Sequence, residues 1–125
     1  MTSQKENLFQ QGVKYFNNGY FFEAHDTFEE LWLDEREESK VFYQGLVQLS
    51  TGFYHLVMKN LKGAESQLTK GLQKLSKYEP KYENIDVSEL IRQVKTCLER
   101  IRETGNGGFH RELIQLIPKL TAGVN

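Results

Sequence analysis

One uncharged run of 18 residues, Val41 to Met58, constrains the fold of this chain more than any other feature. It contains no proline, and as an α-helix it would be about 27 Å long, at roughly 1.5 Å per residue. Its large apolar side chains would fill one broad arc of the helix, at about 100° per residue. They are Phe42, Leu46, Leu49, Phe53, Leu56 and Val57, and the arc is widened by Tyr43, Val47, Tyr54 and Met58. A helix that is apolar over so much of its surface is normally buried, so we expect a central helix over about residues 38–59.

The remaining sector of this helix is narrow and polar. It holds Gln44, Gln48, Thr51 and His55, within about 60° of one another. Gly45 and Gly52 flank this strip and would let another backbone approach closely. The glutamines and the histidine also make the run too polar, and 18 residues make it too short, for a membrane span.

The rest of the chain repeats the helical period. We expect helices over about residues 4–18 and 21–36 before and after a first turn, and a fourth helix that Asn60 caps and that stops before Pro80. A fifth helix should follow Asp86, and a short last one should end near Pro118. The sequence Asp86-Val87-Ser88-Glu89 has the form of a capping box with an acid as its first residue. No alternating strand pattern is found, and residues 78–85 are expected to form a loop. The prediction is therefore an all-α fold, a single compact bundle of about five helices in one domain, residues 1–125.

Composition narrows the classes of function. The net charge is −1 and no basic cluster is present, which argues against a nucleic-acid partner. Cys97 is the single cysteine, so a disulfide within the monomer is impossible, and its place on an apolar stripe indicates packing. The first residues contain no apolar signal core, and we expect a cytoplasmic protein without a membrane partner.

The ionisable residues in the segment of residues 21–36 fall into two groups by their position on the expected helix. One side of the expected helix holds a solvated acidic face, formed by Glu23, Asp26, Glu30 and Asp34. His25 and Glu29 do not join this face. They are four residues apart, next to Phe22 and Trp32, at the edge of the apolar surface.

Two sequence motifs stand out together: GYFFEAHDTFEELW (Gly19–Trp32), and YQGLVQLSTGFYHL with KNLKGAESQLTKGLQKL behind it (Tyr43–Leu75). They resemble the family called domain of unknown function 309, in which a glutamate-alanine-histidine run leads to a tryptophan and a glutamine-glycine-leucine helix ends in tyrosine-histidine. The resemblance covers residues 9 to about 78, and it implies an all-α bundle with no established activity. The family positions correspond to Glu23, His25, Glu29, Trp32, Gln44, Gln48 and His55. The family often has glycine where this chain has Lys59.

A polar site between the second and the central helix is one hypothesis. His25 and Glu29 would face Gln48 and His55 across the Gly45/Gly52 gap. Two histidines and a carboxylate form a ligand set for a divalent metal such as zinc, iron or manganese, with open positions at which water could be activated for hydrolysis. The metal ligands would then be His25, Glu29 and His55.

Two other interpretations of these residues stay open: a buried hydrogen-bonded network, and a strip that faces water. No known catalytic motif is present, so catalytic residues are unassigned and enzyme activity is an open question. We favour a non-catalytic scaffold or interaction module with a buried polar network. The alternative is a metal-dependent hydrolase or small-ligand binder, with a pocket formed by His25, Glu29, Trp32, Gln44, Gln48 and His55. No cofactor is established.

A homodimer is a further prediction, with the protein partner otherwise unassigned. Symmetric dimers are the commonest assembly of small helical proteins. The contact surface would be formed by Tyr43, Val47, Tyr54 and Met58, provided that helix packing leaves these four side chains on the outside.

Overall fold

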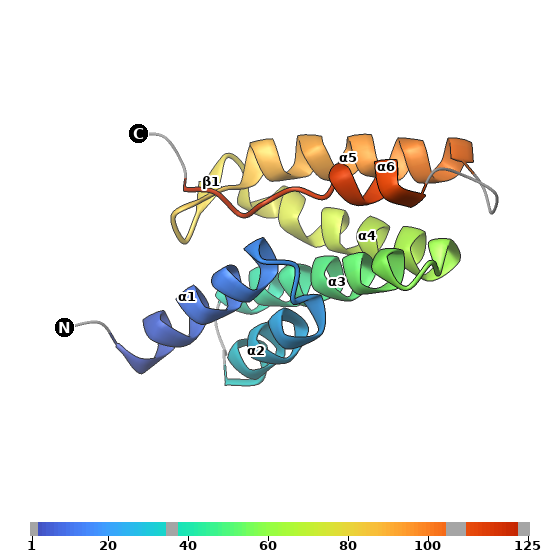
Figure 1. Ribbon diagram of the computed structural model, residues 1–125. Helices are drawn as coiled ribbons and strands as arrows, with labels where there is room; N and C mark the ends of the chain where they lie inside the picture. Colours follow the sequence, from blue (N-terminus) through green and yellow to red (C-terminus); the bar gives the residue numbers. More distant parts are fainter. Residues whose placement is uncertain (1–2, 35–37, 105–109, 123–125) are drawn as a thin grey trace.

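The computed structural model, which describes residues 3–34, 38–104 and 110–122, confirms the all-α prediction (Figure 1). Within these residues six helices are present, one for each segment that the sequence predicts to be helical. They are α1 (Gln4–Asn17), α2 (Phe21–Asp34), α3 (Ser39–Val57), α4 (Leu61–Leu75), α5 (Val87–Thr104) and α6 (His110–Gln115). The expected boundaries agree with these to within a few residues wherever the structure describes them.

Helix α3 is the centre of the bundle, as predicted. It packs against α2 on one side and α4 on the other, while α1 packs on α2 and α5 on α4 (Figure 1). The apolar arc of α3 accounts for this position, since Phe42, Leu46, Leu49, Phe53 and Leu56 are all fully buried. Burial of large apolar side chains is the main stabilising term, so the sequence of α3 determines where the other helices lie.

Glycine residues bring α3 and α4 into close contact. A β-carbon on Gly52 would lie 2.7 Å from a side-chain carbon of Leu68, and one on Gly45 would lie 2.9 Å from Leu75. The close approach expected at Gly45 and Gly52 is therefore confirmed. The helix that makes it is α4, so the hypothesis that α2 faces α3 across this gap is wrong: leucines of α4 fill the space.

The turn from α3 to α4 is a Schellman motif. The N–H of Asn60 donates to the His55 carbonyl at 2.8 Å, and the N–H of Lys59 donates to the Leu56 carbonyl at 3.0 Å. This geometry places Lys59 at φ 65°, in the left-handed region. This conformation favours glycine, because only glycine adopts it without a steric penalty.

Replacing Lys59 by glycine is expected to raise the free energy of unfolding by about 0.5–1 kcal/mol. The left-handed conformation costs an ordinary residue roughly 1–2 kcal/mol, and the extra chain entropy of glycine offsets only part of that. Urea denaturation of Lys59→Gly measures the change. The matched control is Lys70→Gly on the exposed face of α4, which should lose about 1 kcal/mol. Equal losses in both variants would contradict the assignment of strain to Lys59.

The prediction of a loop without strands at residues 78–85 is wrong. After a short 3₁₀ turn (Ser76–Tyr78), β1 (Lys81–Tyr82) and β2 (Ile85–Asp86) form an antiparallel hairpin. Each strand has two residues, which is too short to show an alternating pattern. The hairpin also anchors the start of α3, because the Tyr82 hydroxyl lies 2.5 Å from the Ser39 hydroxyl.

The segment after α6 is held by contacts with residues far away in the sequence. The side-chain amide of Asn17 donates to the Leu120 carbonyl at 3.0 Å and accepts from the Leu120 N–H at 2.7 Å. The Asp86 N–H donates to the Thr121 carbonyl at 2.9 Å, and Ala122 forms a bridge with Ile85. Leu120 is buried, so this segment closes the core at the end of α1.

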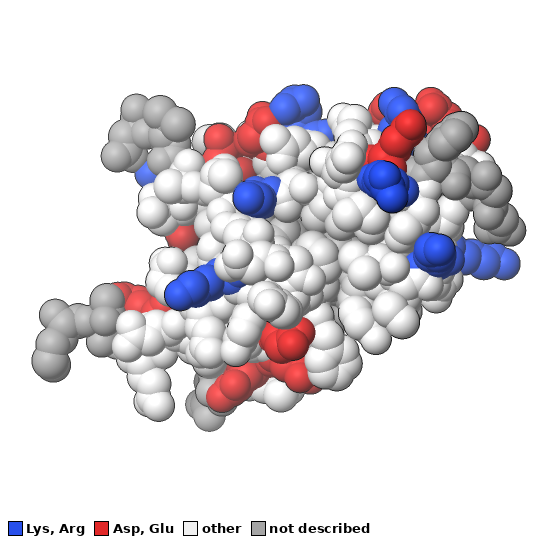
Figure 2. Space-filling view, viewed as in Figure 1, with Lys and Arg blue, Asp and Glu red and all other residues white. Residues whose placement is uncertain are grey.

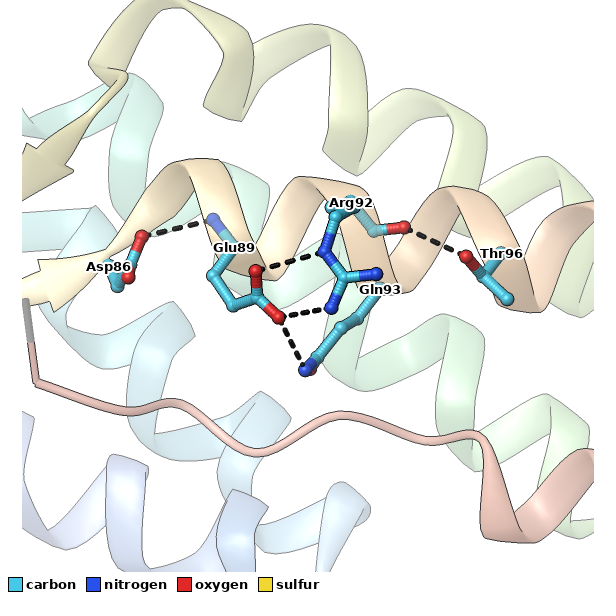
Figure 3. Close-up of polar contacts among 5 residues, drawn as sticks. All are labelled: Asp86, Glu89, Arg92, Gln93 and Thr96. Atoms are coloured by element: carbon cyan, nitrogen blue, oxygen red, sulfur yellow. Dashed lines mark hydrogen bonds and ion pairs between the residues drawn. The ribbon is translucent and has the colours of Figure 1, made fainter.

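One half of the predicted capping box at α5 is confirmed. The carboxylate of Asp86 accepts the Glu89 N–H at 3.0 Å. The reciprocal bond is absent, because the Glu89 carboxylate binds Arg92 and Gln93 instead (Figure 3). The Asp86 N–H, which Glu89 would have satisfied, donates to Thr121. The hydrogen bond from Arg92 also holds the pKa of Glu89 below its usual value.

Cys97 is fully buried in the core, as its apolar stripe predicts, and burial raises the pKa of its thiol from 9.0 to about 11. A pKa that is raised on folding stabilises the fold while the group is protonated. The contribution is complete below pH 9 and is lost as the pH rises through about 11. We expect the free energy of unfolding to fall by about 2–3 kcal/mol over this pH range, at roughly 1.4 kcal/mol per unit of pKa shift.

Urea denaturation of the wild type and Cys97→Ala at several pH values checks this. The variant should be less stable at pH 8 but should lose less between pH 9 and 11. Burial also raises the pKa of Tyr78, but the effect of Tyr78 on stability is the same in the wild type and in Cys97→Ala. Parallel pH profiles would contradict a contribution from the thiol.

Candidate functional site

Helix α2 brings His25 and Glu29 together, one turn apart. Nε2 of His25 lies 3.7 Å from the Glu29 carboxylate, and its Nδ1 lies 3.2 Å from the carboxylate of Asp26. The side chains of His25 and Glu29 are 27% and 43% exposed. The pair therefore lies at the rim of the α2–α3 contact, where water reaches both groups.

His55 has a different set of neighbours. Its Nδ1 lies 3.3 Å from the side-chain nitrogen of Asn60, whose oxygen accepts the Gly63 N–H at 3.0 Å and caps α4, as expected for Asn60. A β-carbon on Gly63 would lie 3.0 Å from the His55 ring. His55 thus packs in the α3–α4 turn.

A row of four rings runs from His25 to His55, with Phe22 and Tyr54 between the two histidines. Phe22 contacts His25 at a centroid distance of 6.1 Å and Tyr54 at 5.7 Å, and Tyr54 contacts His55 at 6.2 Å. The aromatic pair thus lies between the residues that the hypothesis brings together. Within the described ranges no group of three or more His, Cys, Asp or Glu residues is placed to hold a metal ion. The ligand set His25, Glu29 and His55 stays a prediction.

The polar strip of α3 is partly exposed along its length, at Gln44, Gln48, Thr51 and His55. Gln48 is partly exposed as a residue, but its Oε1 atom is buried. This atom has no hydrogen-bond partner among the residues that the structure describes. Trp32 on α2 is partly buried and packs against the core. These four strip residues and Trp32 lie at the rim of the bundle.

The outer surface of α2 has a feature that the sequence predictions do not include. Phe22, Asp26, Glu29 and Leu33 are spaced four, three and four residues apart and share one stripe of the helix, which we call the outer stripe. Its two ends are apolar and open to solvent, Phe22 at 54% and Leu33 at 67% exposure. The helical spacing of these four residues is the sequence signal that could have identified the outer stripe.

The apolar surface continues from α2 onto α3. Phe22 contacts Tyr54, and Met58, one turn further along α3, is 61% exposed. Tyr43 and Val47 are buried, so the prediction that they form a dimer surface with Tyr54 and Met58 is wrong. Tyr43 packs among core rings, 6.0 Å from Phe9 and 5.7 Å from Phe42.

Acidic residues border this apolar surface. Glu23, Asp26 and Glu30 are exposed, as predicted, while the side chain of Asp34 lies outside the described part of the chain. In Figure 2 red side chains gather low in the view, where Figure 1 shows α2. The solvated acidic face is thus confirmed for these three residues, and it adjoins the outer stripe.

The family described as "Domain of unknown function (DUF309)" matches residues 9–67, which cover α1 from Phe9 onward, α2, α3 and the first half of α4. This range contains all the residues of the candidate site. No curated protein matches the chain. None of the helices, over the residues described, is both long enough and apolar enough to cross a membrane.

Proposed function

We propose that this chain, which belongs to the DUF309 family over residues 9–67, is a non-catalytic interaction module that docks a protein partner on the α2–α3 face. This face consists of the outer stripe of α2 together with Tyr54 and Met58. The observation that supports the proposal is the exposure of large apolar side chains on neighbouring helices: Phe22, Leu33 and Met58 are all more than half exposed. Exposed apolar surface bordered by polar residues, such as that of Phe22 and Tyr54, marks interaction sites.

Site-specific photo-crosslinking in the cell of origin tests the proposal. A photoreactive phenylalanine analogue replaces Phe22, and the matched control carries it at Tyr20, which is 56% exposed and two residues away. Tyr20 contacts Tyr15 of α1. The proposal predicts one discrete adduct, identified by mass spectrometry, from position 22 and not from position 20. No adduct at position 22, or the same adducts at both positions, would contradict it.

The metal-dependent hydrolase is the second candidate, and the observation that favours it is the contact of His25 with two carboxylates. A tightly bound ion would stabilise the fold by about 2.7 kcal/mol at a hundredfold excess over its dissociation constant. On our account, added zinc or manganese leaves the melting temperature unchanged. Stabilisation that is lost in each of His25→Ala, Glu29→Ala and His55→Ala would establish the metal site.

A further inference from the structure

The outer stripe of α2 has a definite order of chemical groups. Phe22 and Leu33, eleven residues apart, are its apolar ends, and Asp26 and Glu29 lie between them. At roughly 1.5 Å per residue the two apolar side chains are about 16 Å apart along the helix. The carboxylates remain open to solvent, with side-chain exposures of 60% for Asp26 and 43% for Glu29.

The Asp and Glu residues of α2 give this helix charges of one sign. Helix α2 contains no Lys or Arg, and its other charged residues, Glu23, Glu30 and Asp34, are also acidic. His25 of the same helix contacts both carboxylates of the stripe. A surface with apolar ends and an acidic centre is complementary to a segment with apolar ends and a basic centre.

We infer, on the basis of the proposed function, that the partner docks through a basic amphipathic helix, with two apolar side chains over Phe22 and Leu33 and Lys or Arg opposite Asp26 and Glu29. Apolar burial at the two ends supplies the affinity, because each large side chain removed from water stabilises the complex. The charge pairs supply the specificity, because they become partly desolvated between the apolar ends.

A second copy of this chain fits the same face poorly. In a symmetric dimer each copy presents the same surface patch, so two acidic stripes would meet. Like charges that are brought together across an interface are unfavourable. Repulsion between the two acidic stripes therefore favours a basic partner over a homodimer on this face.

Three designed peptides test the inference by fluorescence anisotropy. Each is an alanine-rich helix with two leucines at the spacing of Phe22 and Leu33. Between the leucines, the two positions on the same stripe of the helix carry lysine, glutamine or glutamate, and the others carry alanine. The lysine peptide should bind at least about tenfold more tightly than the glutamine peptide, which corresponds to roughly 1.4 kcal/mol. The glutamate peptide should bind weakest. Added salt should reduce these differences, because it screens the charges.

A charge swap separates this inference from the proposed function. In Asp26→Lys with Glu29→Lys the order of the peptides should reverse, so that the glutamate peptide binds best. Phe22→Ser should weaken every peptide, whereas Tyr20→Ser should change none. Equal binding of all three peptides that still requires Phe22 would overturn the basic partner and leave the docking face intact. Absence of any peptide binding, while position 22 still forms its crosslink, would likewise overturn the basic partner alone. If neither peptide binding nor the crosslink at position 22 were observed, the docking face would be overturned as well.

Discussion

Leu49→Ala is expected to lower the free energy of unfolding by about 2–5 kcal/mol, as removal of a buried leucine side chain does in other cores. Leu49 is fully buried in the middle of α3, and a β-carbon at Gly71 of α4 would lie 2.8 Å from its side chain. The variant therefore loses buried apolar surface and leaves a cavity between two closely packed helices. Urea denaturation measures the change.

Val57→Ala is the matched control for this prediction. Val57 belongs to the same helix and the same apolar arc in the sequence, but it is 41% exposed. Its truncation should cost less than about 1 kcal/mol, because much of the side chain is already in water. Equal losses in the two variants would contradict the placement of Leu49 at the centre of the core.

Gly52→Val is expected to cost about 1–3 kcal/mol through overpacking. The new β-carbon would lie 2.7 Å from a side-chain carbon of Leu68 and 3.2 Å from the Leu68 backbone nitrogen. A flexible side chain can move aside, but the backbone of α4 cannot do so without separating the two helices. The melting temperature of the variant should fall accordingly.

Thr51→Val introduces a residue of similar shape at the neighbouring, partly exposed position of α3. Its stability should stay within about 0.5 kcal/mol of the wild type, as for most surface substitutions. If Gly52→Val were as stable as Thr51→Val, the close approach of α3 and α4 at Gly52 would be wrong.

Local signals predicted much of this fold. The apolar arc of α3 indicated its central position, the asparagine at position 60 indicated the cap of α4, and Asp86 indicated the start of α5. The family resemblance drew attention to Lys59, whose left-handed φ favours glycine. These features depend on a few neighbouring residues, so the sequence contains their physical cause.

Local sequence signals could not predict the long-range contacts. Asn17 binds the backbone of Leu120, 103 residues further along the chain, and no local pattern predicts that pair. The same limit applies to the candidate site. The helical wheel placed polar residues on both α2 and α3, but it could not tell that α4 covers the glycines or that Phe22 and Tyr54 lie between His25 and His55.

Chemical-shift mapping of the ¹⁵N-labelled protein with the lysine peptide tests the central claim most directly. The claim is that partner binding takes place on the α2–α3 face. The account predicts that the perturbed amides lie in α2 from Phe22 to Leu33 and in α3 from Tyr54 to Met58, with α5 unchanged. Perturbations that centre on α5, or on Tyr15 and Tyr20, would contradict it.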